Sequence, residues 1–142
     1  MGNAYAVLGA YQRALQCHEQ HMRISRETGD RRGEGHAWGN MGNVHSAVGH
    51  SRRALECHEQ HLNIARTTGD RRGQGNACGN MGNAFFELGN ARRALECHEQ
   101  HMRIARENGD RRSEGLAWGN MGNAHAELGD ARRALRCYEE SL

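Results

Sequence analysis

A forty-residue self-similarity constrains this chain more than any other feature. Residues 33–72 align with residues 73–112 without a gap and share 26 of 40 positions. Residues 113–142 continue the pattern, and residues 1–32 fit a repeat that lacks its first eight positions. A period of this length indicates stacked copies of one supersecondary unit. The sequence therefore predicts a single array over 1–142, with two whole repeats between two partial ones, and favours a piece of a longer array.

Each repeat has the pattern of two helices separated by short turns. Gly69 suits the left-handed end of one helix, and Asp70 suits the N-cap of a first helix over about 71–88. Gly89 and Asn90 then predict a second turn and a second helix over about 91–108. Apolar residues at helical spacing form the expected packing stripe of each first helix. These stripes are Trp38, Met41, Gly42, His45 and Val48; Cys78, Met81, Gly82, Phe85 and Leu88; and Trp118, Met121, Gly122, His125 and Leu128.

Turns of this length force consecutive helices to lie antiparallel, so the unit is a helical hairpin. One hairpin cannot cover its own apolar stripe, and hairpins must therefore stack. A stacked array needs only a thin continuous core, which agrees with a hydrophobic content of 37%. The predicted fold is all-α, a right-handed α-solenoid of stacked antiparallel hairpins.

Composition excludes several function classes. The 19 basic residues are all arginine, so chemistry that needs a lysine is absent, and the formal net charge is only +2. No apolar run is long enough to span a membrane, and no secretory signal is visible. Five cysteines without a Cys-x-x-Cys pair indicate reduced thiols and a cytoplasmic protein. No nucleophile, base and orienting group come together, so we expect neither an enzyme nor a cofactor.

The repeat resembles the tetratricopeptide (TPR) pattern, carried here by Trp118, Met121–Gly122, His125, Gly129 and the pair Ala134 and Tyr138. The Met-Gly-Asn triplets at 41–43, 81–83 and 121–123 and the long period are similar to the Leu-Gly-Asn repeats of the Pins/LGN type of G-protein-signalling modulator. This resemblance implies a scaffold or signalling adaptor that binds extended, acidic-rich segments of other proteins. The G-protein-binding motifs of that family lie outside its repeats, and none is visible here.

In a right-handed stack the first helices line the concave side, where asparagines recur beside the apolar stripe. A carboxamide both donates and accepts hydrogen bonds, so it can pair with the backbone of an extended peptide. The TPR resemblance supports this role for the asparagine after the motif glycine. The predicted peptide-binding residues are Asn3, His36, Asn40, Asn43, Asn76, Asn80, Asn83, Glu87, Asn120, Asn123 and Glu127. The alternative is that these asparagines bond neighbouring helices and stiffen the stack.

Arginine pairs stand at the turns between repeats. We expect them to select an acidic peptide, although a solvated face of mixed charge would have the same composition. The pairs are Arg31 and Arg32, Arg71 and Arg72, and Arg111 and Arg112.

Other functions remain as alternatives. The array could be a structural spacer that self-associates through open ends, or the arginines could hold nucleic acid, although balanced charge and few aromatics argue against that. Cysteine and histidine recur in the second helices and could suit a transition metal, but their spacing lacks the i, i+4 pair of zinc helices. These weak metal candidates are Cys57, His58, His61, Cys97, His98 and His101. We instead expect His58 and His98 to be core residues with hydrogen-bonded partners.

Overall fold

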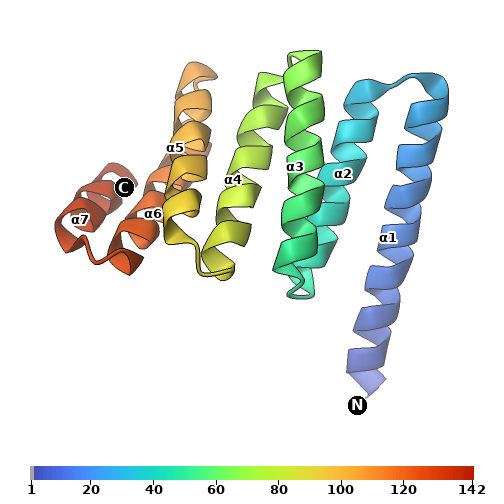
Figure 1. Ribbon diagram of the computed structural model, residues 1–142, viewed down its shortest axis with the longest axis horizontal. Coiled ribbons are helices and arrows are strands. Elements are labelled where there is room, and N and C mark those ends of the chain that lie inside the picture. The colour runs from blue at the N-terminus through green and yellow to red at the C-terminus, as the bar shows by residue number, and fades with distance from the viewer. Residues whose placement is uncertain (1) are drawn as a thin grey trace.

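A computed structural model describes residues 2–142, with side chains from Ala6 onward, and this part of the chain contains seven α-helices and no strand. The helices follow one another across the molecule in chain order, with α3 in front of α2 and α5 in front of α6 in this view, and the two termini lie at opposite ends (Figure 1). Their bounds are α1 (Gly2–Thr28), α2 (Arg31–Ala47), α3 (Ser51–Thr68), α4 (Arg71–Glu87), α5 (Ala91–Glu107), α6 (Arg111–Glu127) and α7 (Ala131–Glu140).

Each helix packs against the next one in the chain, which produces the expected stack of antiparallel hairpins. The first helices α2, α4 and α6 also touch one another in sequence, whereas in the described residues the second helices α3, α5 and α7 do not. The array is therefore tighter on the side of the first helices, which places them on the concave wall.

The predicted caps between repeats are confirmed. Gly69 adopts the left-handed conformation with φ 71°, and Asp70 accepts a hydrogen bond from the backbone N–H of Gly73 at 2.9 Å. The turns inside the repeats are also left-handed, with φ 84° at Gly89, and Asn90 accepts a bond from the N–H of Arg93 at 3.1 Å. Left-handed backbone is almost free for glycine and costly for other residues, so these positions end the helices.

Glycines inside the first helices allow the two helices of a hairpin to approach closely. A Cβ atom at Gly42 would lie 2.6 Å from the ring of His58, and one at Gly82 would lie equally close to His98. A Cβ at Gly75 would lie 2.9 Å from Ile104. Close packing thus offsets the helix-propensity cost of glycine, which is about 1 kcal/mol relative to alanine.

One feature differs from the sequence prediction, and one helix departs from the repeat pattern. Leu88 and Leu128 do not belong to the packing stripe: they follow the last turns of α4 and α6 and are 43% and 44% exposed. Gly9 aligns with the turn glycines, yet α1 continues through it as one helix of 27 residues. A missing side-chain cap does not account for this continuation, because α3 begins after Gly49 although His50 makes no side-chain cap bond.

All five cysteines are free thiols, as expected. Within residues 2–142, each helix is either too short or too polar to pass through a bilayer.

Candidate functional site

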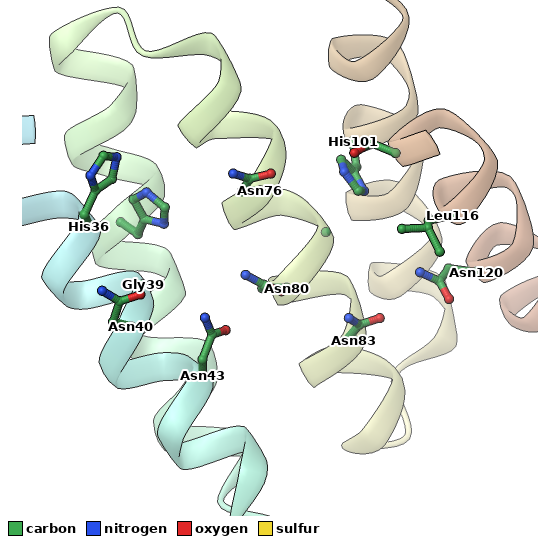
Figure 2. Close-up of a pocket in the computed structure, with 13 residues that line it drawn as sticks. His36, Gly39, Asn40, Asn43, Asn76, Asn80, Asn83, His101, Leu116 and Asn120 are labelled. Carbon is green, nitrogen blue, oxygen red and sulfur yellow. The ribbon is translucent and has the colours of Figure 1, made fainter. Parts of the chain in front are cut away.

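A groove with a volume of about 660 Å³ crosses the concave wall. Its walls come from three consecutive first helices, α2, α4 and α6, so its long dimension runs across the helix axes (Figure 2). A smaller recess of about 240 Å³ continues it toward the C-terminal ends of these helices. We call the two together the concave groove.

Asparagines dominate the walls of the concave groove. Figure 2 shows carboxamides of α2 and α4 lining the larger groove from neighbouring first helices. We define the carboxamide ladder as the groove-lining asparagines Asn40, Asn43, Asn76, Asn80, Asn83, Asn120 and Asn123. His36 also lines the groove, and Glu87 lines its recess. The structure therefore brings most of the predicted peptide-binding residues together on one surface.

The carboxamide ladder is largely unused inside the protein. Among the described residues, Asn123 is the only member whose side chain bonds to another side chain: the hydroxyl of Tyr138 donates to its Oδ1 at 2.6 Å. The other six carboxamides do not bridge neighbouring helices, so the stiffening role considered above is confined to Asn123. Their donors and acceptors remain open to solvent or to a ligand.

His61 and His101 lie on the groove floor, although they were expected only as weak metal candidates. They come from the second helices and reach the groove where the first helices carry Gly39 and Gly79, whose missing side chains leave room for the rings. Burial lowers the pKa of both imidazoles, and the neighbouring His36 lowers that of His61 further while Asp70 opposes the shift. Both rings are therefore neutral at pH 7. The sequence signal for this floor was the recurrence, in two successive repeats, of a glycine in the first helix and a histidine in the second (Gly39 with His61, Gly79 with His101).

His58 and His98 are core residues, 1% and 2% exposed, but the predicted hydrogen-bonded partners are wrong. Among the side chains that the structure describes, none is a hydrogen-bond partner for either ring nitrogen of His58 or for Nδ1 of His98. The rings lie against the helix backbone at Gly42 and Gly82, where the amide groups are already bonded within the helix. Burial, followed by the charge of His61 or His101, lowers the pKa of each to about 4.

The turn arginines divide into two groups. Arg31 and Arg71 are engaged within the protein: Arg31 lies 2.8 Å from Glu34, and Arg71 lies 2.7 Å from Glu107. Arg32 lies 3.9 Å from Asp70, at the limit of an ion pair.

The remaining arginines are less engaged in contacts within the protein. Arg111 and Arg112 line a shallow depression beside Asn120. Arg72 lies near Asp110, whose pKa is lowered by hydrogen bonds from Ser113 and, more weakly, by the Arg72 charge. Among the described residues, Arg72, Arg111 and Arg112 therefore form no ion pair, while Arg32 keeps its long contact with Asp70.

Two of the predicted peptide-binding residues are not among the residues that line the concave groove. The side chain of Asn3 lies outside the described residues, and Glu127 is exposed but lines none of the recesses described above. The metal candidates Cys57, His58, His61, Cys97, His98 and His101 do not form a site: from Ala6 onward, no three His, Cys, Asp or Glu side chains are placed to hold one ion.

The tetratricopeptide repeat family profile matches residues 1–67 and 75–142, almost the whole chain. The chain belongs to the tetratricopeptide repeat family. TPR repeats generally mediate protein–protein interaction and are generally non-catalytic scaffolds. No curated protein sequence matches the chain.

Solved structures show the same fold at low sequence identity. The TPR domain of Arabidopsis FLU is 19% identical with a TM-score of 0.75, over 78% of this chain and 93% of that domain. BtubC from P. vanneervenii is 18% identical with a TM-score of 0.83, over 94% of this chain and 56% of BtubC. A Podosopora anserina protein described as a kinesin light chain with nearly identical TPR-like repeats is 19% identical with a TM-score of 0.79, over 98% of this chain and 68% of that one.

Together, the family profile and the solved structures show that the chain is a TPR protein with the solenoid fold. The narrower similarity to Leu-Gly-Asn repeats, with the signalling role it implies, stays a prediction.

Proposed function

We propose that this TPR protein binds an extended segment of another protein in the concave groove, and that the carboxamide ladder holds the peptide backbone. The observation that carries the proposal is the set of six carboxamides without side-chain partners on three adjacent helices. Each offers an N–H₂ donor and a carbonyl acceptor, which match the C=O and N–H groups of a peptide. Backbone recognition of this kind gives affinity without reading a particular side-chain sequence.

The proposed peptide carries acidic side chains. The groove walls and floor hold carboxamides and neutral imidazoles. The arginines Arg32, Arg72 and Arg112 each precede a groove-lining residue of the same helix by four positions, about one turn. Exposed charge pairs each contribute roughly 0.2–1 kcal/mol, so the arginines would bias the choice of peptide while the ladder supplies most of the affinity.

The experiment is a binding titration with a fluorescein-labelled ten-residue peptide of alternating glutamate and serine. We expect the Asn80→Ala/Asn83→Ala variant to bind this probe roughly tenfold more weakly, because each lost hydrogen bond costs about 0.5–1.5 kcal/mol. Fluorescence anisotropy measures the affinity, and circular dichroism checks that the helices remain.

Asn63→Ala is the matched control, since Asn63 is an exposed asparagine on the second helix α3, outside the concave groove. It should bind the probe like the unaltered protein. Equal affinity of the double variant and the Asn63→Ala control, with the fold intact, would remove the ladder from the mechanism.

A second candidate is self-association through an end of the array. The helix α7 packs only on α6 among the described helices and leaves Leu135 63% exposed. Sedimentation velocity should then show a concentration-dependent dimer that Leu135→Glu abolishes. A sedimentation coefficient that does not change with concentration would rule this candidate out.

A further inference from the structure

The asparagines of the carboxamide ladder belong to longer stripes of side chains that also carry charge. On α4, Arg72, Asn76, Asn80, Asn83 and Glu87 follow one another at spacings of 4, 4, 3 and 4 residues. At 3.6 residues per turn, these spacings keep all five side chains on one face of the helix. We call such a set a groove stripe.

The same stripe recurs on α6 and, in part, on α2. Its members on α6 are Arg112, Leu116, Asn120, Asn123 and Glu127, and on α2 they are Arg32, His36, Asn40, Asn43 and Ala47. Every stripe begins with an arginine, and those of α4 and α6 end with a glutamate. One edge of the concave groove therefore carries Arg72 and Arg112 at the N-terminal ends of α4 and α6, and the other edge carries Glu87 and Glu127 at their C-terminal ends. On α2, Arg32 already lies 3.9 Å from Asp70.

These charges oppose the helix dipole. Arg72 and Arg112 are the second residues of α4 and α6, where the positive end of the dipole favours acids. Glu87 and Glu127 are the last residues of the same helices, where the negative end favours bases. Charges placed against the dipole lower the stability of a helix. Because these four charges do not serve helix stability, we assign them a role in binding.

These four charged residues of the groove stripes have few partners within the protein. Among the residues described, neither Arg72 nor Arg112 lies within 4.0 Å of a carboxylate, in contrast to Arg71, which is paired with Glu107. Glu87 accepts a hydrogen bond from the hydroxyl of Ser51 but forms no ion pair, and it lines the recess of the concave groove beside Asn83. A ligand that crosses the groove would thus meet free charge of opposite sign on its two sides.

We infer that the groove ligand is an extended peptide in which acidic and basic residues alternate. This inference rests on the proposed function. In an extended strand, successive side chains point to opposite sides, while the backbone N–H and C=O groups lie perpendicular to them. When the backbone faces the carboxamide ladder, alternate side chains therefore point to the two edges. Acidic side chains then meet Arg72 and Arg112, and basic ones meet Glu87 and Glu127.

Three labelled ten-residue peptides test the inference at low ionic strength. The first alternates glutamate and lysine, the second places five glutamates before five lysines, and the third alternates glutamate and serine. The alternating glutamate–lysine peptide should bind about tenfold more tightly than its block isomer, because only the alternating peptide can present acids to one edge and bases to the other at both stripes together.

Charge-removing variants then locate the effect. Glu87→Gln/Glu127→Gln should weaken the glutamate–lysine peptide about fivefold and should not weaken the glutamate–serine peptide. Ala47→Glu, which completes the stripe of α2, should strengthen binding of the glutamate–lysine peptide about twofold. The controls Glu96→Gln and Arg103→Gln change exposed residues of α5 that line none of the groove and should have no effect.

The outcomes separate the two proposals. Equal binding of the alternating and block peptides, or no response to Glu87→Gln/Glu127→Gln, overturns the inference, and the proposed function stands if Asn80→Ala/Asn83→Ala still weakens the glutamate–serine peptide. If Asn80→Ala/Asn83→Ala does not weaken the binding of the peptides, or if none of the three peptides binds, both proposals are overturned.

Discussion

Gly79→Ala should lower the free energy of unfolding by about 1–3 kcal/mol, whereas Gly119→Ala, at the same position of the next repeat, should raise it by about 1 kcal/mol. A Cβ atom at Gly79 would lie 2.7 Å from Nδ1 and 3.0 Å from Cε1 of His101, so the hairpin would have to open. At Gly119 the nearest atom is Cβ of Ser141, at 4.0 Å. There alanine meets no obstacle and gains its higher helix propensity.

Urea unfolding followed by circular dichroism measures both changes, each against the unaltered protein. The two variants differ from it by the same methyl group in the same repeat register, so intrinsic propensity cancels in the comparison. Changes of the same sign and size in the two variants would mean that close packing of second-helix histidines against the glycines does not shape the hairpins.

Acidification should destabilise the protein strongly between about pH 6.5 and pH 4. Burial lowers the pKa of His58 and His98 in the folded chain to about 4, from 6.5 when unfolded. A lowered pKa means that the unfolded chain takes up protons first, so the contribution to stability is complete above pH 6.5 and is lost as the pH falls toward 4. At pH 5 each histidine should cost about 2 kcal/mol, since one pKa unit corresponds to roughly 1.4 kcal/mol.

The melting temperature between pH 7.5 and pH 5 tests this expectation. His58→Phe and His98→Phe keep a planar ring at these positions, where the last repeat has Tyr138, and should flatten the profile by removing the titrating group. His21→Gln changes an exposed histidine and should leave the profile unchanged. A melting temperature that stays constant down to pH 5 in the unaltered protein would show that these rings are not buried neutral groups.

Local chemistry explains why the helices could be predicted closely. The turn and cap residues act through the backbone of their own turns, so their effect can be predicted from adjacent residues in the sequence. They are Gly69, Asp70, Gly89 and Asn90. The prediction was wrong at Leu88 and Leu128, because helical spacing alone does not show that the helix ends one residue earlier. The continuous helix α1 shows the same limit of local patterns, because Gly9 aligns with the turn glycines without forming a turn.

The groove is formed by contacts between helices, and only some of its lining residues could be predicted from the sequence. Stacking of first helices on the concave side placed the carboxamides of Asn40, Asn80 and Asn120 on one wall. The histidine floor was missed, because the approach of His101 to Gly79 exists only across the hairpin. Spacing also gave both arginines of each pair the same role, whereas Glu107, far along the chain, engages Arg71 alone.

Side-chain amide signals in a ¹⁵N–¹H correlation spectrum test groove binding most directly, because they report on each carboxamide separately. Addition of the glutamate–serine peptide should shift the NH₂ signals of Asn40, Asn43, Asn76, Asn80, Asn83 and Asn120. It should leave those of Asn63 and Asn108, which lie outside the concave groove, in place. Saturating peptide that shifts Asn63 or Asn108 while the six ladder signals stay still would contradict capture of a peptide by the carboxamide ladder.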